Sequence, residues 1–153
     1  MANTYTQIHI QFVFVVKYRQ ALINANWKDE LYKYITGIVQ TNKHKMICIN
    51  GMPDHIHALI GVRPSQSISD LMQDVKAGSS KWINENGLVK GKFEWQEGYG
   101  AFSYSKSHLK DVIRYIENQE AHHNKKTFKE EYIEFLEKFE VEYDTKYIFK
   151  ELE

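Results

Sequence analysis

The hydrophobic pattern of this 153-residue chain switches repeatedly between the period of a strand and the period of a helix. Residues 5–18 place branched or aromatic side chains at every second position, which predicts a long β-strand. Residues 27–44 and 67–86 carry apolar side chains three and four positions apart, which is typical of amphipathic helices. The other expected elements are strands over 45–50, 55–62 and a glycine-broken 93–104, then helices over about 106–122 and about 127–139.

The order of these elements is β-α-β-β-α-β, followed by two further helices. This order predicts an α+β fold of the ferredoxin-like, split βαβ type, an antiparallel sheet with helices on one face. The length predicts a single domain over 1–153. The opposite face of the sheet needs a cover, and the second subunit of a homodimer is the cover we expect.

Composition favours a packed globular chain, because 42% of the residues are hydrophobic and 14% are aromatic. The single cysteine, Cys48, excludes a disulfide framework and a zinc site built on several thiolates. The first residues lack the pattern of a secretion signal, and no apolar run approaches the roughly 20 residues that cross a bilayer. We therefore expect a cytoplasmic protein with no membrane partner.

The charged residues are unevenly distributed, although the formal net charge is zero. Basic residues are in excess before residue 110 and acidic residues after it. The basic part could present a positive face to phosphate groups, and Lys76, Lys81 and Arg63 are the candidate contacts to DNA. The alternative is that each of these side chains is an ordinary charge on a solvated surface.

Two histidines one residue apart, His55 and His57, begin the expected strand over 55–62. Alternate side chains of a strand point the same way, so both imidazoles should share one face. Two neutral imidazoles on one face can bind a divalent cation. The alternative is a pair of hydrogen-bonded histidines at a sheet surface.

Tyr115 and Gln119 are four residues apart in the expected helix over about 106–122, so their side chains should be neighbours. Both lie at the edge of its apolar stripe, where a side chain can meet packed protein and a ligand. The alternative for Tyr115 is a ring against the core with its hydroxyl in water. His122 and His123 diverge by about 100° on a helix, and a role at the helix C-terminus suits them better than joint metal binding.

Five blocks of sequence follow one another along nearly the whole chain. Together they resemble the single-tyrosine HUH transposases of small bacterial insertion sequences (IS200-like transposases) and the related REP-associated tyrosine transposases. The blocks are PDHIHALI (53–60), KAGSSKWI (76–83), WQEGYGAFS (95–103), YIENQE (115–120), and HH (122–123) followed by TFKEEY (127–132).

This resemblance implies one HUH transposase domain over residues 1–153. His55 and His57 match the two histidine ligands of the family, Gln119 matches its third metal ligand, and Tyr115 matches its nucleophile. The implied cofactor is Mg²⁺ or Mn²⁺. The implied substrate is single-stranded DNA with a hairpin, cleaved and rejoined through a 5′-phosphotyrosine intermediate. The resemblance also implies a homodimer in which the tyrosine helix could complete the site of either subunit.

Asp54 is a weaker candidate for a general base, because strand alternation would point its side chain away from the face of His55. Alternatives from other classes are a domesticated hairpin-binding protein without transposition activity, a phosphodiesterase that uses water, and a structural dimer. The first predicts hairpin binding without cleavage, and the second predicts turnover without a protein–DNA adduct.

Overall fold

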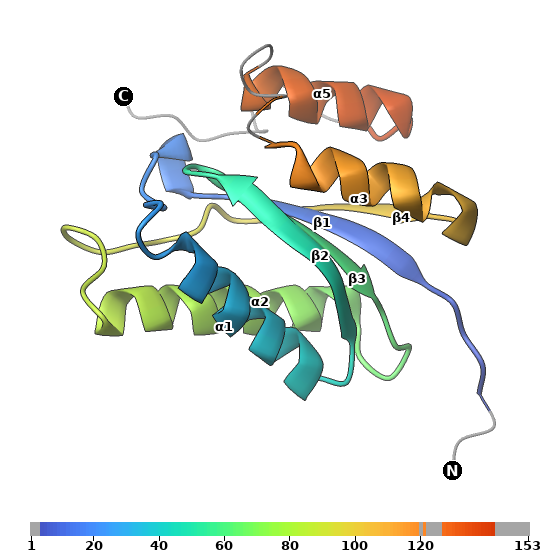
Figure 1. The fold of residues 1–153 in the computed structure, drawn as a ribbon, viewed down its shortest axis with the longest axis horizontal. Helices are drawn as coiled ribbons and strands as arrows, with labels where there is room; N and C mark the ends of the chain where they lie inside the picture. The colour runs from blue at the N-terminus through green and yellow to red at the C-terminus, as the bar shows by residue number, and fades with distance from the viewer. Residues whose placement is uncertain (1–3, 120, 122–126, 143–153) are drawn as a thin grey trace.

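The computed structural model describes residues 4–119, 121 and 127–142. Its centre is a four-stranded antiparallel sheet in the order β2-β3-β1-β4 (Figure 1). The element order and the strand order are those of the ferredoxin-like split βαβ arrangement, so the predicted fold class is confirmed. The strands are β1 (His9–Val15), β2 (Lys45–Met52), β3 (His55–Gly61) and β4 (Gly100–Tyr104).

Helices cover both faces of the sheet, as Figure 1 shows. Helices α1 (Lys28–Thr41) and α2 (Ile68–Glu85) pack on one face and enclose the larger apolar core. Helices α3 (Leu109–Glu117) and α5 (Phe128–Lys138) pack on the other. The prediction that the second face awaits a partner subunit was wrong in this respect, because the chain supplies that cover itself.

Strand alternation divides the side chains of the two central strands between the two faces. On β1, Phe12 and Phe14 enter the core beneath α1 and α2, whereas Val13 and Val15 face α5. The antiparallel register pairs Val13 with His57 and Val15 with His55. Residues opposite each other in a sheet point to the same side, so both histidines lie on the α3 and α5 face.

Strand β1 is shorter than the predicted 5–18. The chain leaves the sheet after Val16 through the short 3₁₀ turn η1 (Lys17–Arg19), where Tyr18 adopts a positive φ of 61°. The predicted strand over 93–104 is likewise reduced to β4. Before β4, Trp95 forms only an isolated bridge with Val16, and its indole N–H donates to Ser79 Oγ at 2.9 Å.

The hairpin between β2 and β3 turns one step later than the sequence suggests. Strand β2 continues through the expected Asn50-Gly51 turn to Met52, which pairs with His55. Pro53 and Asp54 therefore form the two-residue loop. Gly51 lies so close to β3 that a Cβ atom there would collide with the backbone oxygen of His55.

The regular α-helix within the predicted range of about 106–122 is shorter than expected at both ends. A 3₁₀ turn, η2 (Lys106–His108), precedes α3, and α3 stops at Glu117. The Asn50 side-chain amide donates to the backbone oxygens of Ile116 and Glu117, at 3.0 and 3.2 Å, and fixes the end of α3 to β2.

The N-terminus of α5 is where the sequence places it. Thr127 accepts a hydrogen bond from the backbone N–H of Glu130, which confirms the expected cap. Among the described residues, no helix is both long enough and apolar enough to span a membrane.

Candidate active site

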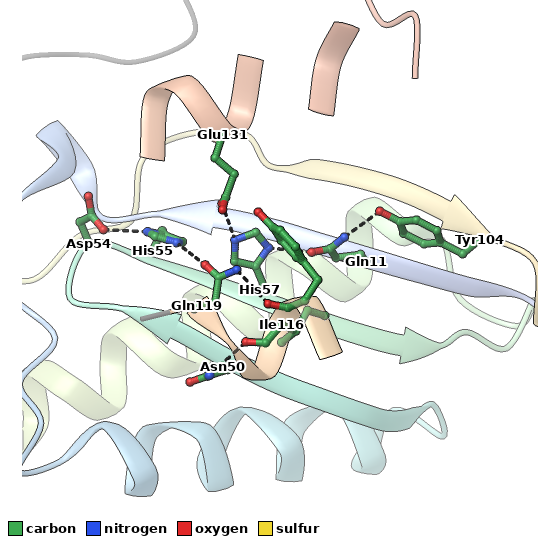
Figure 2. Close-up of polar contacts among 10 residues, drawn as sticks. Gln11, Asn50, Asp54, His55, His57, Tyr104, Ile116, Gln119 and Glu131 are labelled. Carbon is green, nitrogen blue, oxygen red and sulfur yellow. Dashed lines mark hydrogen bonds and ion pairs between the residues drawn. The ribbon is translucent and has the colours of Figure 1, made fainter. Parts of the chain in front are cut away.

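The two histidines of β3 are completely buried between the sheet and helices α3 and α5. Their ring centroids are 5.2 Å apart, and the rings are nearly perpendicular. The ring of Phe128, from α5, stacks on that of His55 at 4.0 Å. Figure 2 shows the polar side chains that converge on this pair from β1, α5 and the residues just after α3.

Hydrogen bonds fix the orientation of both imidazoles through their Nδ1 atoms. His55 Nδ1 lies 2.7 Å from Asp54 Oδ1, and His57 Nδ1 lies 2.7 Å from Gln11 Oε1. The Gln11 amide nitrogen donates to the Tyr104 hydroxyl at 2.8 Å, which turns the amide oxygen toward His57 (Figure 2). In its neutral form, an imidazole that donates its Nδ1 proton to Asp54 or Gln11 presents the lone pair of Nε2 to the other side, as metal-binding histidines do.

The prediction that Asp54 points away from the face of His55 was wrong. Asp54 belongs to the hairpin loop rather than to β3, which begins at His55. Strand alternation therefore does not govern its side chain, and its carboxylate reaches the imidazole next to it.

The Nε2 atoms of both histidines face oxygen atoms. His55 Nε2 is 3.1 Å from Gln119 Oε1, and His57 Nε2 is 3.0 Å from Glu131 Oε1. A lone pair facing an oxygen acceptor is unfavourable unless a proton or a metal ion lies between them. Ligand atoms of His55, His57 and Glu131 lie within 4.8 Å of one another, so this donor set fits a single divalent cation.

Gln119, a predicted ligand, lies two residues after the end of α3, where the backbone is again helical, and is completely buried. Its amide nitrogen donates to the backbone oxygen of Tyr115 at 3.5 Å, so its oxygen is left to face His55. The structure thus brings the predicted His55, His57 and Gln119 together.

Glu131, on α5, was not predicted as a site residue, although only 5% of it is exposed. It lies on the same side of α5 as Phe128 and Phe135, three residues after one and four before the other. A carboxylate within the apolar stripe of a helix is the signal that could have revealed it.

Tyr115 belongs to α3, and its ring lies edge-on to the rings of His57 at 5.9 Å and of Phe135, on α5, at 5.4 Å. Burial raises the pKa of the Tyr115 phenol well above its ordinary value, and the nearby Glu131 carboxylate raises that pKa further. The phenol is therefore held protonated, and a cation at the histidines would oppose this effect. A cavity of about 680 Å³ opens on Tyr115, with Ser105, His108 and Lys138 among its lining residues.

The candidate DNA contacts are not gathered at this site. Lys76 and Lys81 belong to α2, on the opposite face of the sheet. The Lys76 ammonium donates to the backbone oxygens of Gln96 and Gly98 at 2.6 and 2.7 Å, and burial lowers its pKa.

Lys81 forms an exposed ion pair with Glu85 at 3.8 Å. Arg63 follows β3, and its backbone N–H donates to His44 Nδ1. Contacts of Lys76, Lys81 and Arg63 with DNA stay predictions. His122 and His123 lie outside the described residues.

The fold and the site define the class of this protein: a ferredoxin-like α+β domain with a buried histidine and carboxylate cluster, suited to a metal ion, beside a tyrosine. Comparison with known families is consistent with that class. The family described as "Transposase IS200 like" matches residues 4–119, and the chain belongs to this family of transposases.

Individual relatives agree with the family. The ISDra2 transposase TnpA of Deinococcus radiodurans is 26% identical over an alignment of 118 residues, and the match covers 74% of this chain and 84% of that protein. A crystal structure from Deinococcus radiodurans R1, described as a transposase, aligns with a TM-score of 0.63 at 22% identity, covering 78% of this chain and 95% of the other. A REP-associated tyrosine transposase bound to a REP hairpin aligns with a TM-score of 0.60 at 13% identity, covering 80% and 73%.

Proposed function

We propose that this transposase cleaves and rejoins single-stranded DNA next to hairpins, through a covalent 5′-phosphotyrosine on Tyr115. The observation that carries the proposal is the position of the Tyr115 ring, 5.9 Å from the ring of His57, a member of the buried histidine and carboxylate cluster that can hold a metal ion. The hairpin bound to the REP-associated relative supports the choice of substrate.

The residues that would hold the metal are His55, His57 and Gln119. Gln119 Oε1 lies 3.1 Å from His55 Nε2, and the ring centroids of the two histidines are 5.2 Å apart. Mg²⁺ or Mn²⁺ bound there would act as a Lewis acid that neutralises charge on the scissile phosphate. The protein's own contribution is rigidity, because Asp54 and Gln11 hold the two imidazoles in place before substrate arrives.

In the proposed reaction the Tyr115 oxygen forms a bond to phosphorus as the bond from phosphorus to the 3′ oxygen breaks. The phenol loses one proton and the departing 3′ oxygen gains one, so the strand ends in a free 3′ hydroxyl. Phosphodiester energy is retained in the tyrosine ester. The 3′ hydroxyl of another strand can therefore attack the phosphotyrosine, release Tyr115 and join new ends without a nucleoside triphosphate.

The test is a denaturing gel of purified protein with Mn²⁺ and a pool of hairpin-bearing single-stranded DNA. We expect a covalent protein–DNA adduct with wild type and none with Tyr115→Phe. Tyr34→Phe is the matched control: Tyr34 lies on α1, on the opposite face of the sheet, where it stacks on Trp82. Tyr34→Phe should form the adduct as wild type does.

Two other results would contradict the proposal. Tight hairpin binding by wild type without any adduct or cleavage would indicate a binding protein that no longer transposes. Equal cleavage by wild type and Tyr115→Phe would show that water, rather than the phenol, attacks the phosphate.

A further inference from the structure

Helix α5 brings a carboxylate to the histidine pair from outside the segment that matches the family, which ends at residue 119. We propose that Glu131 is a ligand of the bound metal, so that the ion ties α5 to the sheet beside Tyr115. This inference rests on the metal site of the proposed function.

The geometry places the Glu131 carboxylate where a ligand must be. Its Oε1 is 3.0 Å from His57 Nε2, and ligand atoms of Glu131, His55 and His57 fall within 4.8 Å of one another. Gln119 Oε1 lies beside His55 Nε2 at 3.1 Å. One ion at the centre would therefore be held by two nitrogen and two oxygen donors from three separate parts of the chain.

The charge of Glu131 leads to the same assignment. A carboxylate that is only 5% exposed is costly to bury unless a positive charge accompanies it. A neutral His57 that donates its Nδ1 proton to Gln11 Oε1 presents the lone pair of Nε2 to Glu131, 3.0 Å away. A divalent cation between the two side chains would place a positive charge beside the carboxylate, and a carboxylate oxygen is the ligand that Mg²⁺ and Mn²⁺ favour.

The rest of α5 holds Glu131 in this position. One turn before it, Phe128 stacks on the ring of His55, and one turn after it, Phe135 stacks on Phe102 of β4 at 5.4 Å. The carboxylate therefore enters the site on a rigid element fixed on both sides. Metal binding and docking of α5 should strengthen each other.

The experiment is a calorimetric titration of the full-length, chelator-treated protein with Mn²⁺. We expect Glu131→Gln to weaken Mn²⁺ binding at least tenfold, because the amide keeps the shape of the side chain but loses its charge. Glu130→Gln is the matched control, since it removes the same charge from an exposed neighbour on the same helix. Glu130→Gln should bind Mn²⁺ as wild type does.

A second readout does not depend on any variant. In wild type, Mn²⁺ should slow amide hydrogen exchange throughout residues 128–138, because the ion fixes α5 to the sheet. This measurement also decides the matter should Glu131→Gln fail to fold. Unchanged exchange over 128–138 when Mn²⁺ is bound would overturn the inference.

The outcomes separate this inference from the proposed function. Wild-type affinity in Glu131→Gln, with binding lost in His57→Ala, would leave the metal site standing and overturn the role of Glu131. No Mn²⁺ binding by wild type would overturn the metal site and with it the role of Glu131. A missing DNA adduct together with the expected loss of affinity in Glu131→Gln would contradict only the proposed reaction.

Discussion

At the scale of single residues, the orientation of each histidine is fixed by a hydrogen bond to its Nδ1 atom, and the two partners come from different parts of the chain. Asp54 is adjacent in sequence to His55, whereas Gln11 reaches His57 from the next strand and is itself held by Tyr104. Such partners typically contribute 10- to 100-fold to metal affinity or activity, so Gln11 and Asp54 belong to the site as fully as the ligands do.

The single cysteine gives a prediction at this scale. Burial, followed by the charge of Glu117, raises the pKa of the Cys48 thiol from 9.0 to about 11. At pH 8 the thiolate fraction is then about a hundredfold lower than for an unshifted thiol. Alkylation by iodoacetamide at pH 8 should therefore be about a hundredfold slower in the folded protein than in urea, as followed by mass spectrometry.

The pH dependence provides the control. The alkylation rate of folded protein should keep rising about tenfold per pH unit beyond pH 9, where an ordinary thiol begins to level off. Equal rates in folded and unfolded protein at pH 8 would contradict the raised pKa.

The sequence predicts the residues of the site that are close together along the chain, but not Glu131, whose place in the site depends on tertiary packing. The shared face of His55 and His57 follows from strand alternation, and the proximity of Gln119 to Tyr115 follows from a helical turn. Glu131 becomes a neighbour of His57 only because α5 packs across the sheet. No periodicity within α5 specifies that contact.

At the scale of elements, the structure gives the second face of the sheet to α3 and α5. Hydrophobic periodicity predicted each helix but could not indicate which face it would cover. The C-terminal end of β1 and the N-terminal end of β4 are shortened for local reasons. The chain turns at Tyr18 with a positive φ, and the Trp95 indole bonds to Ser79 of α2 while Trp95 makes only an isolated bridge to Val16.

Two glycines provide a matched prediction about these elements. Gly51→Ala would force a Cβ atom against the backbone of His55 and Ile56, so we expect a loss of about 1–3 kcal/mol in the free energy of unfolding. Gly37 lies in α1 with nothing within 4 Å of an added Cβ, so Gly37→Ala should instead stabilise the protein by about 0.5–1 kcal/mol.

Urea unfolding measures both changes. Because Gly51 adjoins the strand that carries His55, Gly51→Ala should also weaken Mn²⁺ binding, whereas Gly37→Ala should leave it unchanged. Equal stability of Gly51→Ala and wild type would show that the hairpin is looser than the structure indicates.

At the scale of the whole molecule, Tyr115 and the histidines meet within one chain. The family resemblance implies a homodimer, yet the uncovered sheet face that also suggested one is filled by α3 and α5. A dimer that keeps this arrangement would use another surface, and each subunit would hold its own Tyr115 beside its own histidines.

Mixing two inactive variants tests this arrangement. Tyr115→Phe and His55→Ala each lose one component, and we expect no DNA adduct from their mixture, because each chain needs both components. A tagged and an untagged wild-type protein, mixed in the same way and recovered by the tag, report whether subunits exchange. Restored adduct formation in the variant mixture would show that the site is shared between subunits.

The position of α5 in the chain has a consequence for biosynthesis. Translation produces the sheet, the histidines and Tyr115 before α5, and until α5 docks, Val13, Val15 and Phe102 are uncovered on the sheet. An exposed apolar sheet face makes a nascent chain prone to aggregation and attractive to chaperones. Docking of α5, the helix that brings Glu131 to the histidines, therefore also covers the apolar sheet face through which the nascent chain could aggregate.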